Sequence, residues 1–113
     1  MSLHTPYAVT QPTREEIAAL EGATLLEFGT DWCGFCKAAQ PAVAEALAAQ
    51  PGVRHLKVED GPGRPLGRSF SVRLWPTLVF LQDGREVERL VRPHAPAPVA
   101  QALLRLAQAS GAG

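Results

Sequence analysis

The chain has 113 residues and is 46% hydrophobic, which suits one globular domain whose core needs no disulfide or metal. Its 11 basic and 11 acidic side chains cancel, so no overall field would draw it to nucleic acid or an anionic membrane. The two cysteines are therefore available for chemistry, and we expect a protein or a small-molecule thiol as partner.

The first twelve residues are polar and turn-forming, without the charged and apolar segments of a secretory signal. No stretch approaches membrane-spanning length. We therefore expect a flexible N-terminal extension over residues 1–12, one domain over residues 13–109, a disordered tail over residues 110–113 and a reducing, cytoplasmic setting. A periplasmic setting stays open if a signal was removed from the natural chain.

The domain begins with a predicted helix and a predicted strand. Thr13, followed three residues later by Glu16, fits a capping box that opens a short helix ending near Gly22. Residues 23–29 form a compact apolar run, which is typical of a strand buried on both faces.

A longer helix is predicted next, over residues 34–50, with a kink at Pro41. Residues 53–59 have the pattern of a second strand. The proline and glycine residues between 61 and 65 predict a loop, and the apolar spacing over residues 66–72 indicates one or two helical turns.

The last part of the chain predicts a hairpin and a helix. Residues 77–81 and 86–91 have strand patterns joined through Asp83 and Gly84, a pair that favours a tight hairpin turn. A final helix should begin near Pro98. Its expected buried side consists of Val99, Leu103, Leu104 and Leu106. Helices alternating with strands predict an α/β domain with a mixed sheet covered on both faces.

Both cysteines, Cys33 and Cys36, lie at the start of the longer helix, directly after the apolar strand. A structural disulfide across so short a loop would stabilise the fold only weakly. A zinc site needs about four ligands, and His4, His55 and His94 show no ligand spacing to the cysteines. The placement therefore favours a redox pair.

These residues resemble the thioredoxin family over about residues 13–108. The resemblance rests on an acid in the apolar strand, the cysteine motif, a proline and a lysine after it, a Pro-Thr pair and an Asp-Gly turn. They are Glu27, Trp32-Cys33-Gly34-Phe35-Cys36-Lys37, Pro41, Lys57, Val72-Arg73, Pro76-Thr77 and Asp83-Gly84. The resemblance implies a thioredoxin fold, with a central mixed β-sheet flanked by helices, and thiol–disulfide oxidoreductase activity.

The two cysteines should have different roles. Unpaired N–H groups and the helix dipole favour the thiolate form of Cys33, which makes it the nucleophile. Cys36 follows on the same helical face and can resolve a mixed disulfide on Cys33.

Glu27 and Lys57 are the other two candidate catalytic residues. Glu27 interrupts an apolar strand, so we expect its carboxyl to be desolvated with a raised pKa. The resemblance implies that Glu27 accepts and returns the Cys36 proton, with water as one route, and that the Lys57 ammonium lies near it. The alternatives are that Glu27 faces solvent at a strand end and that Lys57 is a solvated strand lysine.

The resemblance also implies a substrate-binding surface. Its candidate residues are Trp32, Gly34, Phe35, Trp75, Pro76, Thr77 and Arg92. Pro76 should follow a cis peptide bond, and the backbone before it should pair with an extended substrate. For Trp75, an ordinary place in the core is the alternative.

Three positions depart from general thioredoxins. Phe35 lies where proline is usual, Trp75 replaces a smaller aliphatic residue, and Arg92 with Pro93 replaces a glycine-containing turn. We therefore expect a bulkier, more basic docking face. The pair should also be less reducing, because without the proline the helix start is less constrained and the reduced state is better solvated.

The leading functional prediction is a monomeric reductase of protein disulfides with no bound cofactor. The sequence has no dinucleotide-binding fingerprint and no room for a second domain, so a separate reductase or a small thiol must supply the electrons. An oxidase or isomerase of the cell envelope, and a non-catalytic client-binding module, are the alternatives. A Cu(I) carrier is disfavoured, since no methionine neighbours the pair.

Overall fold

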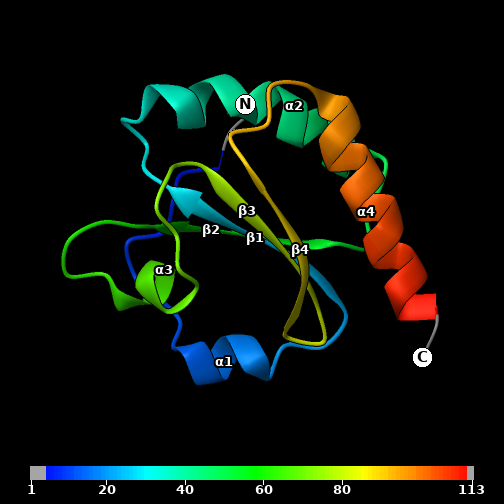
Figure 1. Ribbon diagram of the computed structural model, residues 1–113, viewed down its shortest axis with the longest axis horizontal. Helices are drawn as coiled ribbons and strands as arrows, with labels where there is room; N and C mark the ends of the chain where they lie inside the picture. The colour runs from blue at the N-terminus through cyan, green and yellow to red at the C-terminus, as the bar shows by residue number, and fades with distance from the viewer. Residues whose placement is uncertain (1–4, 112–113) are drawn as a thin grey trace.

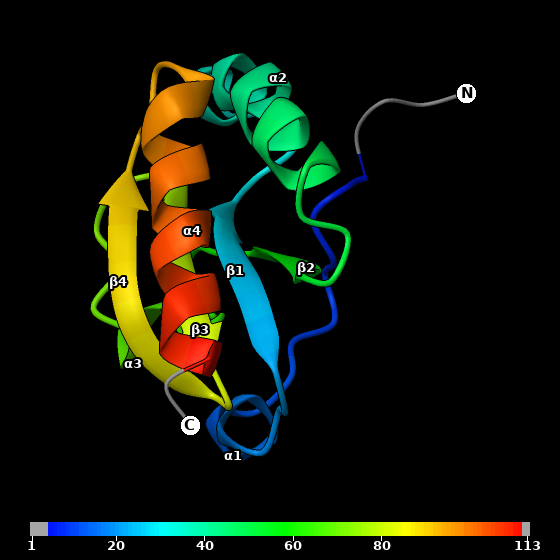
Figure 2. The ribbon, with the colours of Figure 1, turned by 90° about the vertical axis from the view of Figure 1, so that its right-hand side faces the viewer.

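The computed structural model describes residues 5–111, which form one mixed sheet between two layers of helices (Figure 1). The elements are α1 (Arg14–Ala18), β1 (Ala23–Gly29), α2 (Gly34–Ala48), β2 (Arg54–Glu59), α3 (Pro65–Ser69), β3 (Thr77–Gln82), β4 (Arg85–Val91) and α4 (Pro96–Gly111). The strand order is β2-β1-β3-β4, with β1 parallel to β2 and the other pairs antiparallel. Helices α2 and α4 cover one face (Figure 2), and α1 and α3 the other. The predicted architecture is confirmed.

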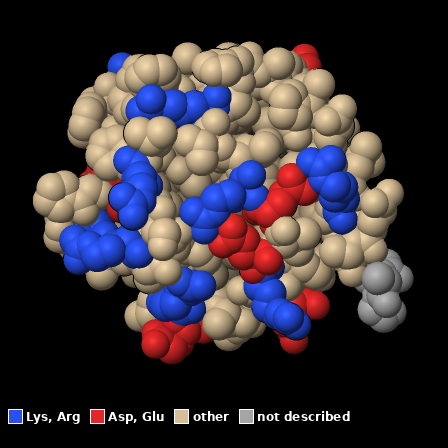
Figure 3. Space-filling model, viewed as in Figure 1, with Lys and Arg blue, Asp and Glu red and all other residues tan. Residues whose placement is uncertain are grey.

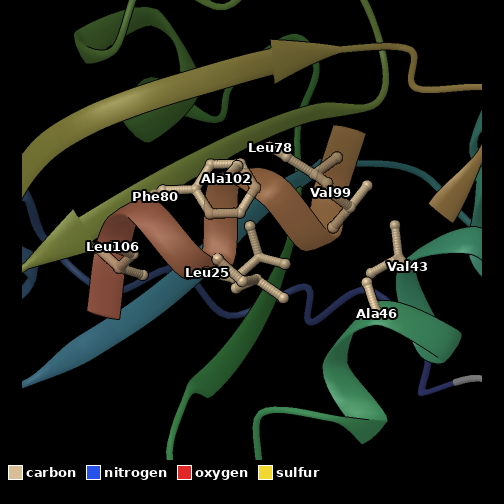
Figure 4. Packing of buried hydrophobic residues seen from close by; sticks show 9 residues of the cluster. Leu25, Val43, Ala46, Leu78, Phe80, Val99, Ala102 and Leu106 are labelled. Carbon is tan, nitrogen blue, oxygen red and sulfur yellow. The ribbon is translucent and has the colours of Figure 1, made fainter. Parts of the chain in front are cut away.

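Side chains on the two faces of β1 pack into two separate hydrophobic cores. Leu25 points into the larger core, among side chains of β3, α2 and α4 (Figure 4). Leu26 and Phe28 point to the opposite face and pack with Ile17 of α1. Because side chains alternate along a strand, Glu27 lies on the same face as Leu25, under α2. The alternation of β1 thus brings a carboxyl group to the helix that carries the cysteines.

Helix α1 is shorter than the sequence predicts. Its capping box is confirmed, since Thr13 Oγ1 accepts from the Glu16 N–H and the Glu16 carboxylate accepts from the Thr13 N–H. The helix ends at Ala18, however, rather than near Gly22. The Gly22 N–H donates to Asp83 Oδ1 over 2.8 Å, and the Gly22 carbonyl accepts from the Asp83 N–H over 2.9 Å. These bonds to the hairpin turn draw the chain away from the helix axis.

The predicted hairpin is confirmed, with Asp83 and Gly84 at its turn. Both residues have positive φ, 52° and 78°, as a tight two-residue hairpin turn requires. Charged side chains on and near this hairpin neutralise one another locally. Arg89 pairs with Glu86, and Arg105 of α4 pairs with Glu88, and Figure 3 shows the two signs side by side on that face.

Helix α4 begins at Pro96, two residues before the predicted Pro98, and continues to Gly111. Residues 110 and 111 of the predicted tail are therefore helical, and residues 112 and 113 lie outside the described residues. The buried stripe consists of Val99, Ala102, Leu103 and Leu106. Leu104 is 54% exposed, so its predicted burial is wrong. One residue turns a helix by about 100°, which rotates Leu104 away from the sheet.

The segment before α1 packs along the outer side of β2 (Figure 2). Ala8 pairs in parallel with Val58 of β2, and Tyr7 is only 4% exposed. Residues 5–12 therefore join the folded domain, rather than forming the separate flexible extension that the sequence predicts. Residues 1–4 lie outside the described residues. None of the helices described within 5–111 is both long and apolar enough to cross a membrane.

The contact between the hairpin turn and α1 yields a stability prediction. A side chain at Gly84 would collide with the Ala18 carbonyl and would also require a positive φ of 78°. Gly84→Ala should lower the free energy of unfolding by about 1–3 kcal/mol, measured by urea denaturation. Gly52→Ala is the matched control, because nothing lies within 4 Å of its added Cβ. Equal stabilities of the two variants would contradict this account of the turn.

Candidate active site

The cysteines differ in depth at the start of α2. Cys33 is the N-cap of the helix, and its Sγ accepts the Cys36 N–H over 3.2 Å. Both thiols are free, with Cys33 8% exposed and Cys36 1% exposed. The predicted nucleophile is therefore the more exposed of the two sulfurs, whereas Cys36 is almost fully shielded from solvent.

Cys36 is held as a thiol. Burial raises the pKa of Cys36 to about 12, and its hydrogen bond with Cys33 acts in the same direction. The Thr30 backbone and the Tyr7 side chain oppose this shift by hydrogen bonding, but only partly. At neutral pH, Cys36 must therefore lose a proton before its sulfur can attack.

Glu27 lies at 0% exposure between the sheet and α2, so the solvent-facing alternative is wrong. Its Oε2 accepts from the Tyr7 hydroxyl and, over 2.8 Å, from Gln40 Nε2. Its Oε1 lies 2.8 Å from His55 Nε2. Burial alone would raise the pKa of Glu27, but the hydrogen bonds from His55, Tyr7 and Gln40 together lower it below its ordinary value. The predicted raised pKa is therefore wrong, because the sequence did not reveal these donors.

Lys57 is 8% exposed, so it is not a solvated strand lysine. Its Nζ donates to Gln40 Oε1 over 2.9 Å and to the Thr5 carbonyl, and it lies 4.4 Å from the centroid of the Tyr7 ring. Lys57 is linked to Glu27 through Gln40, because the Gln40 side chain accepts a hydrogen bond from Lys57 and donates one to Glu27. Lys57 thus orients Gln40 as a donor to the carboxylate.

Aromatic side chains surround the cysteine motif. Trp32 is 71% exposed and Phe35 53% exposed, while Trp75 is half-buried. The Trp32 and Trp75 rings meet edge to face with centroids 5.8 Å apart, and Trp75 Nε1 donates to Asp60 Oδ2 over 2.8 Å. Trp75 is thus held beside the cysteine motif and is not an ordinary core residue. The predicted cis bond before Pro76 is confirmed.

Arg92 covers this face from the turn after β4. Its guanidinium lies 3.8 Å from the centroid of the Phe35 ring, and its Nε donates to the Trp75 carbonyl over 2.8 Å. Its own N–H donates to the Pro76 carbonyl over 2.9 Å. A positive charge therefore lies on the first turn of α2 and next to the backbone before Pro76.

The two remaining predicted binding residues lie at the starts of elements. Gly34 is the first residue of α2, with nothing within 4 Å of where a Cβ would lie. Thr77 is buried at the start of β3, and its hydroxyl donates to the Leu74 carbonyl over 2.6 Å. Gly34 therefore leaves open space beside Cys33, whereas Thr77 supports the turn that carries Pro76.

Sequence reasoning missed three residues of this site: Tyr7, Gln40 and His55. Gln40 comes four residues after Cys36, which places it on the same helical face, and His55 comes two residues before Lys57, on the same face of the strand. Both could have been found from periodicity. Tyr7 had no such signal. In the described part of the chain, no three His, Cys, Asp or Glu side chains converge as metal ligands would.

The lowered pKa of Glu27 predicts a loss of stability in acid. Its ordinary pKa is 4.5, and the folded value is lower, so its contribution to stability is fully present above pH 4.5. Below that pH the unfolded chain takes up a proton that the folded protein does not, and the unfolding free energy falls by about 1.4 kcal/mol per pH unit. Urea denaturation between pH 7 and pH 3 should show a shallower loss for Glu27→Gln. Parallel curves for the two proteins would contradict this.

Three comparisons agree with this geometry. Residues 7–104 match the family model described as Thioredoxin. The chain is 49% identical over 72 residues to a thioredoxin of Chlamydia trachomatis serovar D, covering 62% of this chain and 69% of that protein. It is 38% identical over 89 residues to protein disulfide-isomerase A2 of Pongo abelii, covering 74% of this chain and 17% of that protein.

A solved structure supports the same assignment. Reduced thioredoxin 2 from Pseudomonas aeruginosa PAO1 superimposes with a TM-score of 0.83 at 59% identity, covering 90% of this chain and 94% of that one. The match confirms the thioredoxin fold that the resemblance implied. With its dithiol at the start of α2, the chain belongs to the thioredoxin family and is a thiol–disulfide oxidoreductase.

Proposed function

We propose that this protein reduces disulfide bonds in client proteins through the Cys33-Gly34-Phe35-Cys36 motif. The observation that carries the proposal is the difference in depth between the two thiols, 8% against 1% exposed. The Cys33 thiolate attacks one client sulfur, and the other client sulfur leaves as a thiolate. Cys36 then attacks Cys33 Sγ, which forms the Cys33–Cys36 disulfide and releases the second client thiolate. The client gains the two electrons that the pair loses.

Glu27 is proposed as the acceptor of the proton that Cys36 must lose. Formation of a mixed disulfide removes the free Cys33 thiol, and with it one of the groups that raise the pKa of Cys36. The thiol is then easier to deprotonate, and the buried Glu27 carboxylate is linked to Cys36 through the Gln40 amide, which donates both to Glu27 and to the Cys36 carbonyl. Lys57 acts as a positioning residue, because it holds the Gln40 amide that donates to Glu27.

The docking face is proposed to lie around the cysteine motif, with Trp32, Phe35 and Trp75 as apolar contacts. An extended client segment would pair with the backbone before Pro76, next to Gly34 and Thr77. Arg92 now donates to the Trp75 carbonyl, so its guanidinium would exchange this partner for a client group. A cation at this position favours clients with acidic residues near the disulfide.

Completion of a cycle requires that the disulfide be reduced again. The chain carries no dinucleotide-binding motif, so we propose that a separate reductase or a small thiol donates the electrons to Cys33 and Cys36. This supply of electrons favours a cytoplasmic setting. We further propose that the protein acts as a monomer without a bound cofactor.

Reduction of insulin tests the leading proposal. The wild-type protein should accelerate insulin precipitation with dithiothreitol as electron donor. Cys36→Ser should instead accumulate a mixed disulfide with insulin, visible on non-reducing gels, because the resolving sulfur is missing. Cys33→Ser is the matched control and should neither accelerate insulin precipitation nor form a mixed disulfide with insulin. Trapping by Cys33→Ser rather than Cys36→Ser would reverse the assigned roles.

Two other functions have specific support. Similarity to part of a protein disulfide-isomerase favours an oxidase or isomerase of the cell envelope. The basic, aromatic face formed by Arg92, Phe35 and Trp75 favours a client-binding module. Faster refolding of scrambled ribonuclease than reduction of insulin would favour the isomerase. Alkylation of Cys33 at pH 6 no faster than that of a model thiol would favour the binding module.

The reduction potential is predicted to be less reducing than about −270 mV. Phe35 leaves the helix start less constrained than proline would, so the reduced state of the pair should be better solvated. Equilibration with glutathione buffers, followed by alkylation and mass spectrometry, gives the value. Phe35→Pro should shift it to a more negative potential. A wild-type value at or below about −270 mV would contradict this prediction.

A further inference from the structure

We propose that Tyr7 passes the proton from Cys36 to Glu27 during the resolving step, a role that rests on the proposed function above. The Tyr7 hydroxyl donates to Glu27 Oε2, and the Tyr7 side chain packs in one cluster with Cys36. Tyr7 comes from the segment before α1, far in sequence from the cysteine motif. The resolving cysteine and the carboxylate are thus joined by a residue from a third part of the chain.

The backbone of the N-terminal segment holds the Tyr7 ring in place. The Tyr7 N–H donates to Asp31 Oδ1 over 3.0 Å. The Ala8 N–H donates to the Lys57 carbonyl over 2.8 Å, and its carbonyl accepts from the Glu59 N–H over 2.9 Å. With both neighbouring peptide groups fixed to the domain, the ring is directed inward and is only 4% exposed.

Gly29 makes room for the phenol. A Cβ on Gly29 would lie 2.5 Å from Cys36 Sγ and 2.8 Å from both the hydroxyl oxygen and Cζ of Tyr7. Gly29 follows Glu27 by two residues on the same face of β1, so any side chain there would fill the space between the thiol and the phenol. The absence of a side chain at this position allows the two groups to approach each other.

The buried phenol is suited to transfer a proton without becoming charged. Burial and the neighbouring Glu27 carboxylate raise the pKa of Tyr7 far above its usual range, so the hydroxyl stays protonated. A neutral hydroxyl donates one hydrogen bond and accepts others. It can therefore donate to Glu27 while its oxygen faces the Cys36 thiol.

During the resolving step, the Cys36 thiol proton moves to the Tyr7 oxygen as the Tyr7 proton moves to Glu27 Oε2. This leaves a Cys36 thiolate, a neutral phenol and a protonated carboxyl. The thiolate forms a bond to Cys33 Sγ, and the bond between Cys33 and the client sulfur breaks. The client sulfur leaves with the electron pair. Glu27 then releases its proton through His55, which contacts Oε1 and is 25% exposed.

Several charged groups surround this path. The titratable neighbours are Asp31 before α2, Cys33, Cys36 and Lys37 at its start, His55 and Lys57 on β2, and Glu27 on β1. A cavity of about 480 Å³ also opens beside Tyr7, Cys36 and Lys57. Water in this cavity is the competing acceptor for the Cys36 proton, so the test must separate the two routes.

Stopped-flow reaction with 5,5′-dithiobis(2-nitrobenzoate) separates the steps. Attack by Cys33 releases one coloured thiolate, and attack by Cys36 on the resulting mixed disulfide releases a second. Tyr7→Phe should leave the first phase within about twofold and slow the second about tenfold or more at pH 7. The difference should shrink toward pH 9, where hydroxide replaces the relay. Val9→Ala, an exposed change in the same segment, is the matched control and should alter neither phase.

A second variant and a measurement on the unaltered protein guard against misfolding. Gly29→Ala keeps the phenol but crowds it away from Cys36, so it should slow the second phase with the same pH dependence. In mixtures of H2O and D2O, the wild-type second-phase rate should curve with deuterium content, because two protons move together. A linear dependence, or a Tyr7→Phe rate lowered equally at every pH, would overturn the relay. Loss of the second phase in the wild type would instead overturn the proposed function.

Discussion

The Glu27 carboxylate, buried under α2, is the constraint on which the rest of the site depends. A buried charge is tolerated only where hydrogen-bond donors replace its water shell. Here Tyr7, Gln40 and His55 supply them, one from each of three elements or segments, and Lys57 fixes the Gln40 amide in turn. The same bonds that stabilise the carboxylate therefore attach the N-terminal segment, β2 and α2 to β1.

At the start of α2, the groups around Cys33 lie near the surface, whereas Cys36 lies deeper in the protein. The outer side carries Cys33, the aromatic side chains of Phe35 and Trp75, and the Arg92 cation, where we propose that a client docks. The inner side carries Cys36, which is only 1% exposed and lies beside Tyr7 and a cavity. In the proposed mechanism, Cys33 attacks the client from the outer side and Cys36 attacks Cys33 from the inner side, so the proton would leave on the side away from the client.

Most of the fold could be predicted from the sequence, because local patterns govern it. The Thr13 capping box, the Asp83-Gly84 turn and the apolar run of β1 each depend on residues within a few positions of one another. The cysteine pair at a helix start is equally local. The cis bond before Pro76 came from the family resemblance, since base rates alone oppose it.

The sequence by itself determined the order of elements, the redox pair and its helix start, since these follow from neighbouring residues and periodicity. Only the tertiary structure decided the insertion of Tyr7, the direction of the Glu27 pKa shift and the contact of Arg92 with Phe35. Each joins segments that are distant in the chain. A pKa depends on the balance between desolvation and every donor that reaches the group, and that balance exists only after the chain has folded.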